Sequence, residues 1–155
     1  MRKLIILRGA QGSGKSNFIQ EKNLERFTLS SDTIRLMFNA PELTIDYTET
    51  IPQFNNKKVW QLLFYLLEER MKKGEFTLVD AIHASKEDLT TYKKLAEKYR
   101  YRLYILDFTN VPKEEAIKRN KNRVNYKIVP EYSIERAYKK FATEEISKAF
   151  IQINH

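Results

Sequence analysis

The sequence contains no cysteine and only two histidines, His83 and His155, among its 155 residues. Without cysteine it can form neither disulfides nor Cys-ligated zinc or iron–sulfur sites, and two histidines do not suggest a histidine-rich metal site. No apolar run approaches the roughly 18 residues of a membrane helix, and residues 4–7 are too short a run for a secretory signal. We therefore expect a cytoplasmic protein that has no membrane partner.

Acidic residues are fewer than basic ones: the chain has 20 Asp and Glu against 28 Lys and Arg, which gives a net charge of +8. A basic balance fits a polyanionic partner such as nucleic acid or a phosphorylated ligand. It also fits a lysine-rich composition with a solvated basic face, and charge alone leaves both interpretations open. The length suits one domain over residues 1–155, without repeats or linkers.

The chain alternates short apolar runs with helical patterns. Apolar runs predict buried strands at residues 4–7, 27–30, 76–79 and 103–106. Helical patterns are predicted at residues 15–24, 31–38, 59–71 and 85–99, and again after Pro112 and Pro130. Ser31 is expected to cap the second helix, and residues 39–55 to be irregular. Strands that alternate with helices indicate βαβ units, and so an α/β fold with a parallel sheet.

Glycine is scarce, and three of the four glycines fall within the segment GAQGSGKS. This segment matches the motif G-x-x-x-x-G-K-[ST] and lies between a strand and a helix, the context that favours the motif over a chance glycine-rich turn. Glycines let backbone N–H groups curl around phosphate oxygens, and the helix points its positive end at the same anion. The sequence thus predicts a P-loop NTPase-type fold that binds ATP or another NTP with Mg²⁺ at Gly9, Gln11, Gly12, Ser13, Gly14, Lys15 and Ser16.

Two acidic segments follow strands and should lie beside this loop, since parallel strands end at one edge of the sheet. After the second strand, Asp32 could accept the proton of an attacking hydroxyl, and Arg35 could hold a phosphate of the acceptor. The simpler alternative is that Asp32 complements the helix dipole and Arg35 pairs with it on the surface. After the third strand, Asp80 could join Ser16 in holding Mg²⁺, or simply cap a turn. His83 could touch the acceptor or be a satisfied polar residue.

A basic helix end forms the last candidate element. Arg119 and Arg123 are four residues apart and face the same way, so both could stabilise charge on a polyphosphate. The simpler interpretation is that these cations complement the C-terminus of their helix. The polar stretch that follows, closed by Pro130, is typical of a mobile cover, and we place a C-terminal basic lid at roughly residues 119–130.

The ordered set of motifs resembles the family of 5′-OH polynucleotide kinase domains found in phage and bacterial end-healing enzymes. The resemblance covers about residues 3–142. It depends on the P-loop, Ser31-Asp32 with Arg35, Val79-Asp80, and Arg119-Asn120 with Arg123 and Val129-Pro130. It implies that Lys15 and Ser16 bind the NTP phosphates and metal, that Asp32 is the general base, that Arg35 contacts the acceptor phosphate, and that Arg119 and Arg123 engage the NTP.

The sequence departs from this family at Ile82-His83, which puts acceptor contacts there in question, and no phosphatase or ligase module is expected. The resemblance implies ATP-dependent phosphorylation of the 5′-hydroxyl end of RNA or DNA, with Asp32, Lys15, Arg35 and Arg123 as the catalytic residues. A small-molecule P-loop kinase acting on a nucleoside, sugar or nucleotide sugar is the alternative. A third possibility is an NTP-regulated binding module. The sequence leaves the oligomeric state open.

Overall fold

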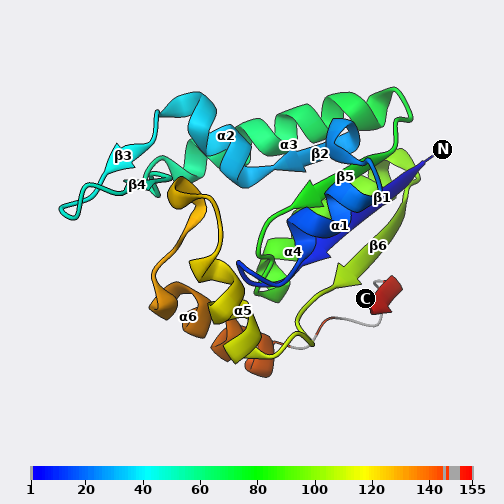
Figure 1. Cartoon of the computed structure of the whole chain (residues 1–155). Coiled ribbons are helices and arrows are strands. Elements are labelled where there is room, and N and C mark those ends of the chain that lie inside the picture. The colour runs from blue at the N-terminus through cyan, green and yellow to red at the C-terminus, as the bar shows by residue number, and fades with distance from the viewer. Residues whose placement is uncertain (1, 145, 147–150, 155) are drawn as a thin grey trace.

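A parallel five-stranded sheet forms the centre of the computed structural model, which describes residues 2–144, 146 and 151–154 (Figure 1). The strand order is β2-β5-β1-β6-β7, and every pairing is parallel. The strands are β1 (Lys3–Arg8), β2 (Thr28–Ser30), β5 (Thr77–Asp80), β6 (Arg102–Asp107) and β7 (Ile151–Asn154). The predicted α/β fold with a parallel sheet is therefore confirmed.

Residues of β1 alternate between two buried faces, which explains why this strand is apolar without a break. Leu4 and Ile6 point to the face that α2 (Ser31–Phe38), α3 (Asn56–Lys72) and α4 (Lys86–Tyr99) cover. Ile5 and Leu7 point to the opposite face, which α1 (Lys15–Glu21) covers. Helices α5 (Lys113–Lys121) and α6 (Glu131–Thr143) pack together beyond the carboxyl ends of the strands (Figure 1).

Helix α3 anchors the larger core through four fully buried side chains at helical spacing, Val59, Leu63, Leu67 and Met71. Each contributes roughly 1.5–3 kcal/mol by leaving water. The predicted stripe is thus the buried face of this helix. None of the helices within the described ranges is long and apolar enough to cross a bilayer.

The ends of two predicted helices differ from expectation. Ser30, not Ser31, is the N-cap of α2: its hydroxyl accepts the N–H of Thr33 at 3.4 Å, and Ser31 is the first helical residue. Adjacent serines offer the same capping chemistry, and the last residue of β2 has the extended backbone that a cap needs. Helix α1 ends at Glu21 rather than at residue 24, where the chain turns into a short 3-10 helix, Glu25–Phe27.

The segment 39–55, predicted to be irregular, contains a small antiparallel hairpin. Its strands, β3 (Glu42–Leu43) and β4 (Glu49–Thr50), have only two residues each, too few for an alternating pattern to reveal them. Beyond the hairpin, the N–H of Ile51 donates to the carbonyl of Tyr126 in the 3-10 helix Asn125–Lys127. Strand β7 was also not predicted, and residues 147–150 and 155 of the same tail lie outside the described part of the chain.

Candidate active site

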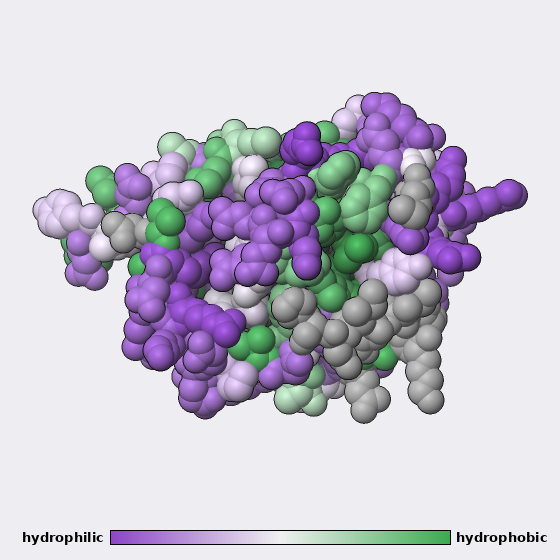
Figure 2. All heavy atoms as spheres, turned by 45° about the vertical axis from the view of Figure 1, so that its right-hand side comes forward, coloured by the Kyte–Doolittle hydropathy of each residue, from purple (hydrophilic) through white to green (hydrophobic). Residues whose placement is uncertain are grey.

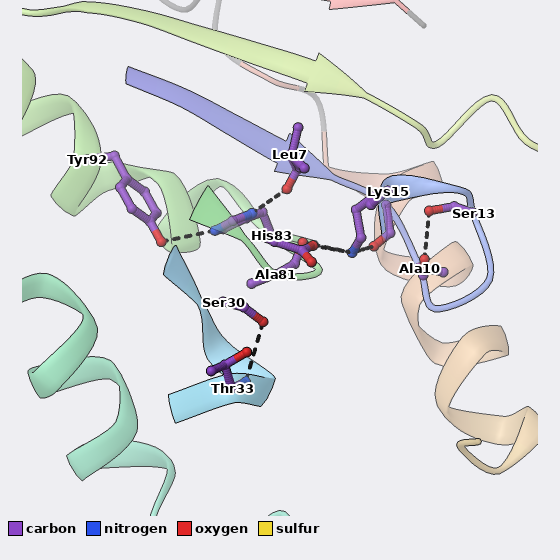
Figure 3. A network of polar contacts seen from close by, with 11 residues as sticks. Leu7, Ala10, Ser13, Lys15, Ser30, Thr33, Ala81, His83 and Tyr92 are labelled. Atoms are coloured by element: carbon purple, nitrogen blue, oxygen red, sulfur yellow. Dashed lines mark hydrogen bonds and ion pairs between the residues drawn. The ribbon is translucent and has the colours of Figure 1, made fainter. Parts of the chain in front are cut away.

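The loop between β1 and α1 has the backbone shape of a phosphate cradle. Gly12 and Gly14 have φ angles of +79° and +99°, which L side chains rarely adopt. A Cβ on Gly12 would lie 2.2 Å from the carbonyl oxygen of Ala116, so only glycine lets α5 pack against the loop. The Ser13 hydroxyl donates to the carbonyl of Ala10 at 2.7 Å and fixes the loop from within (Figure 3).

The Lys15 ammonium lies under the loop, held by backbone oxygens. It donates to the carbonyls of Gly9 at 2.6 Å and Ala81 at 3.0 Å (Figure 3), and it lies 3.6 Å from the Asp80 carboxylate. Burial lowers the pKa of Lys15, while Asp80 and then Asp32 raise it. The cation is therefore desolvated and placed where phosphate oxygens could replace its carbonyl partners.

Asp80 reaches this site because β5 pairs with β1, with Leu7 opposite Asp80 in the register. Burial raises the pKa of its carboxyl group, and the Lys15 ammonium lowers it. Ser16 follows Lys15 at the start of α1 and is exposed to solvent. Asp80 thus comes from the end of β5 and Ser16 from the helix that follows the adjacent strand β1, which fits parallel strands that end at one edge of the sheet.

Asp32 and Arg35 lie on one face of α2, with the Arg35 Nε 3.9 Å from the Asp32 carboxylate. The Asp32 carboxylate is close enough to Lys15, Asp80 and Arg123 to act on all three electrostatically. Burial lowers the pKa of Arg35, and Asp32 raises it. The structure therefore brings the predicted base and acceptor-binding arginine to the same edge as the P-loop lysine.

The lid brings Arg119 and Arg123 to two sides of the same site. The Nη1 of Arg119 lies 3.5 Å from where a Cβ of Gly14 would be, and its Nε donates to Glu115 at 2.9 Å. Burial lowers the pKa of Arg123, and the Asp32 and Asp80 carboxylates raise it. Arg119 therefore lies against the loop, whereas Arg123 faces the two aspartates.

Four buried side-chain atoms have no hydrogen-bond partner among the described residues: Thr77 Oγ1 in β5 and, at this site, Gln11 Oε1, Arg35 Nη1 and Arg123 Nη1. Leaving buried polar atoms unpaired is costly, and guanidinium groups suit phosphate oxygens. The described residues contain no cluster of three or more metal-ligating His, Cys, Asp or Glu side chains. Mg²⁺ at nucleotide sites is held by one or two carboxylates together with substrate phosphates, and Asp80 places one carboxylate beside Lys15. The site thus suits a nucleotide with Mg²⁺.

His83 has a structural position rather than one that faces an acceptor. It is 2% exposed, its Nδ1 lies 2.6 Å from the carbonyl oxygen of Leu7, and its Nε2 lies 3.0 Å from the Tyr92 hydroxyl (Figure 3). A carbonyl can only accept, so Nδ1 carries the hydrogen and Nε2 accepts from tyrosine. Burial lowers the pKa of His83 to about 4, which keeps the ring neutral.

Asn120 is a lid residue to which sequence reasoning gave no role. It is 2% exposed; its amide donates to the carbonyl of Val129 at 2.7 Å, and its oxygen accepts the N–H of Val129 at 3.1 Å. This pair of bonds closes the loop that carries Arg123. The sequence did contain a signal, because Asn120 belongs to the Arg119-Asn120 with Arg123 motif on which the resemblance depends.

Comparison with known proteins bears on the family and the fold of the chain. The model of the AAA domain family matches residues 4–143. No curated protein matches the sequence. Among solved structures, a putative kinase from Chloroflexus aurantiacus J-10-fl superposes with a TM-score of 0.67 at 12% identity, over 98% of this chain and 87% of that one.

A second similarity is to structures of a Pnkp1/Rnl/Hen1 complex. One, the Pnkp1/Rnl/Hen1 RNA repair complex, has a TM-score of 0.70 at 24% identity, over 91% of this chain and 44% of that one. Another has a TM-score of 0.61 at 25% identity, over 76% of this chain and 38% of that one. The present chain therefore spans less than half the length of these two chains, and it shares with them and with the putative kinase a P-loop kinase-like fold.

Proposed function

Because the chain belongs to the AAA domain family and has the fold of P-loop kinases, we propose that it transfers the γ-phosphoryl group of ATP to the 5′-hydroxyl end of RNA or DNA. One observation carries the proposal. A carboxylate, Asp32, lies within electrostatic range of the P-loop Lys15, and beside it Arg35 holds a buried nitrogen that has no partner among the described residues. A base for the 5′-hydroxyl and a guanidinium nitrogen that is free to bind the neighbouring phosphate of the strand are what such an acceptor requires.

On the donor side, Lys15 exchanges its carbonyl partners for oxygens of the β- and γ-phosphates. Arg119, against Gly14, and Arg123, facing the aspartates, neutralise charge as the phosphoryl group moves. The glycine-rich loop, with Gln11 and Ser13, surrounds the phosphates. Ser16 and Asp80 would hold Mg²⁺, which supplies further positive charge when bound.

On the acceptor side, Asp32 takes the proton of the 5′-hydroxyl as its oxygen attacks the γ-phosphorus. The bond between the γ-phosphorus and the β,γ-bridging oxygen breaks, and ADP leaves. Arg35 holds the phosphate next to the reacting nucleotide through its free Nη1 and so orients the strand. The similarity to the Pnkp1/Rnl/Hen1 structures, one of them named an RNA repair complex, supports a polynucleotide acceptor.

The test is phosphoryl transfer from γ-labelled ATP to a matched set of acceptors. The set pairs 5′-hydroxyl RNA and DNA oligonucleotides with the same strands carrying a 5′-phosphate, and adds a nucleoside, a sugar and a nucleotide sugar. We expect label on the 5′-hydroxyl strands alone. Label on a small molecule but on neither oligonucleotide would identify a small-molecule kinase, and ATP binding without any transfer would identify a binding module.

A further inference from the structure

The β3–β4 hairpin forms a projecting arm (Figure 1), whose surface mixes hydrophobic and hydrophilic residues (Figure 2), and three of its large apolar side chains are exposed. Leu43, Ile45 and Tyr47 are 70%, 96% and 88% exposed. The arm is held in one shape, because the N–H of Thr44 donates to the carbonyl of Thr48 at 2.8 Å and their hydroxyls lie 2.7 Å apart. An arm whose turn is closed by hydrogen bonds and which carries exposed apolar side chains is suited to contact with another apolar surface.

A hollow of about 610 Å³ between α3 and α4 offers an apolar lining of the complementary kind. Its apolar walls are Trp60, Phe64, Tyr65 and Leu95. The rings are fixed by the core beneath them: Phe64 lies 5.8 Å from Trp60 and 4.9 Å from Tyr92, between ring centroids. No hairpin residue lines the hollow, so each molecule leaves its own hollow open.

The arm is acidic, whereas the charged residues that line the hollow are one lysine, Lys57, and one acid, Glu68, which is already paired with Lys98. Residues 39–55 include Glu42, Asp46 and Glu49 and no lysine or arginine, although the whole chain carries a net charge of +8. The hollow begins at Lys57, and the first acid of α3 is Glu68, whose Oε1 is already bonded to Lys98 and Tyr99. An acidic arm repels a nucleic-acid backbone and suits a hollow with a basic entrance.

We propose that two copies of this chain form a dimer in which the β3–β4 hairpin of each docks into the α3–α4 hollow of the other. Residues 51–55 connect the hairpin to α3, so arm and hollow are neighbours on one molecule. A two-fold axis between two such neighbours exchanges both arms at once and closes the assembly. This dimer does not depend on the acceptor that the active site uses.

Light scattering during size-exclusion chromatography, over a range of micromolar concentrations, tests the dimer. We expect the wild type to approach twice its monomer mass of 18.5 kDa. Ile45→Asp in the arm and Tyr65→Glu in the hollow should each raise the dissociation constant by about tenfold or more. Tyr132→Glu is the matched control, because Tyr132 on α6 is 63% exposed, as Tyr65 is 62% exposed, but lies outside the hollow.

A mixture of the two variants makes the test specific to this docking. The Ile45→Asp chain keeps an intact hollow and the Tyr65→Glu chain an intact arm, so a mixed pair regains one of the two contacts. We expect the mixture to associate more tightly than either variant alone. A monomeric mass for the wild type at every concentration overturns the proposal. So does an Ile45→Asp variant that dimerises as tightly as the wild type. If the wild type is monomeric and the Ile45→Asp and Tyr65→Glu variants lose affinity for an oligonucleotide, the arm and the hollow bind nucleic acid instead.

Discussion

Asp32 differs from the other acids near the P-loop in its surroundings. The Asp80 side chain is 17% exposed beside Lys15, whereas the Asp32 side chain is 44% exposed and lies near both Arg35 and Arg123. The acid that is more open to solvent is the better placed to receive an acceptor. The position of Asp32 at the start of α2 therefore suits a base, and that of Asp80 suits a metal-side role.

Replacement of Asp32 by asparagine tests this division. Asparagine keeps the shape of the side chain but cannot take a proton, so we expect the transfer rate to fall by roughly 10²–10⁴. ATP affinity should change far less than the rate, since the ion pair of Asp32 is with Arg35 rather than with a residue of the P-loop. Transfer from labelled ATP and equilibrium ATP binding measure the two effects. Glu87→Gln on the exposed first turn of α4 is the control, and an unchanged rate in Asp32→Asn would exclude Asp32 as the base.

His83 makes the stability of the protein depend on pH. Its pKa is about 4 in the folded chain, against 6.5 as its ordinary value, so the unfolded chain binds the proton more tightly. The stability due to the neutral ring is complete above pH 6.5 and is lost as the pH falls towards 4. At about 1.4 kcal/mol per pKa unit, the loss is roughly 3 kcal/mol. Lys15 and Arg8 oppose protonation, and Asp88 favours it.

Replacement of His83 by asparagine removes the titrating imidazole without requiring a change of backbone conformation. His83 has a φ of +50°, a conformation that asparagine tolerates well, and the asparagine amide can still donate towards Leu7. We expect His83→Asn to be less stable at neutral pH and to lose less stability between pH 6.5 and 4 than the wild type does. Urea unfolding at several pH values measures both. Equal pH slopes in the two proteins would show that His83 does not titrate in this range.

At the scale of elements, the sequence predicted the long patterns and missed the short ones. The apolar run of β1 and the helical stripe of α3 are each long enough to fix their type. The two-residue strands of the hairpin are not, because only their partner strands define them. Strand β7 lacks such a signal too, since it is specified by pairing with β6.

The candidate site was predictable in its residues but not in its contacts. Strand ends that meet at one edge were enough to place Asp32 and Asp80 near the P-loop. The contact of Lys15 with the carbonyl of Ala81 depends on tertiary packing, and no spacing reveals it. The same holds for the pair of bonds between Asn120 and Val129.

The two hydrogen bonds between Asn120 and Val129 suggest a variant that tests the lid. Asn120→Ala leaves the N–H and carbonyl of Val129 unpaired and releases the loop that carries Arg123, at a cost of roughly 1–3 kcal/mol. If Arg123 binds the nucleotide, KM for ATP should rise and kcat should fall, while oligonucleotide affinity without ATP changes little. Asn122→Ala, two residues along and exposed, is the control. Identical kinetics in the Asn120→Ala and Asn122→Ala variants would show that Asn120 does not position Arg123.

At the scale of the whole molecule, five segments contribute to one edge of the sheet. The P-loop, the start of α2, the end of β5, α5 and the 3-10 helix of the lid lie together there, while the amino ends of the strands lie opposite (Figure 1). The hairpin joins this assembly through the bond from Ile51 to Tyr126. Helix α2 and the lid are therefore connected through the segment 39–55.

The net charge of +8 gives the final prediction, because binding to a nucleic acid weakens with salt in proportion to the phosphates neutralised. If Arg35 neutralises one phosphate of a single-stranded acceptor, Arg35→Gln should lower the slope of log affinity against log salt by about 0.7. Arg100→Gln, at the C-terminal end of α4 and the start of the loop to β6, should leave the slope unchanged. Fluorescence anisotropy of a 5′-hydroxyl oligonucleotide over a salt series measures both. A wild-type affinity independent of salt would point to a small, weakly charged acceptor, because such a ligand releases few counterions.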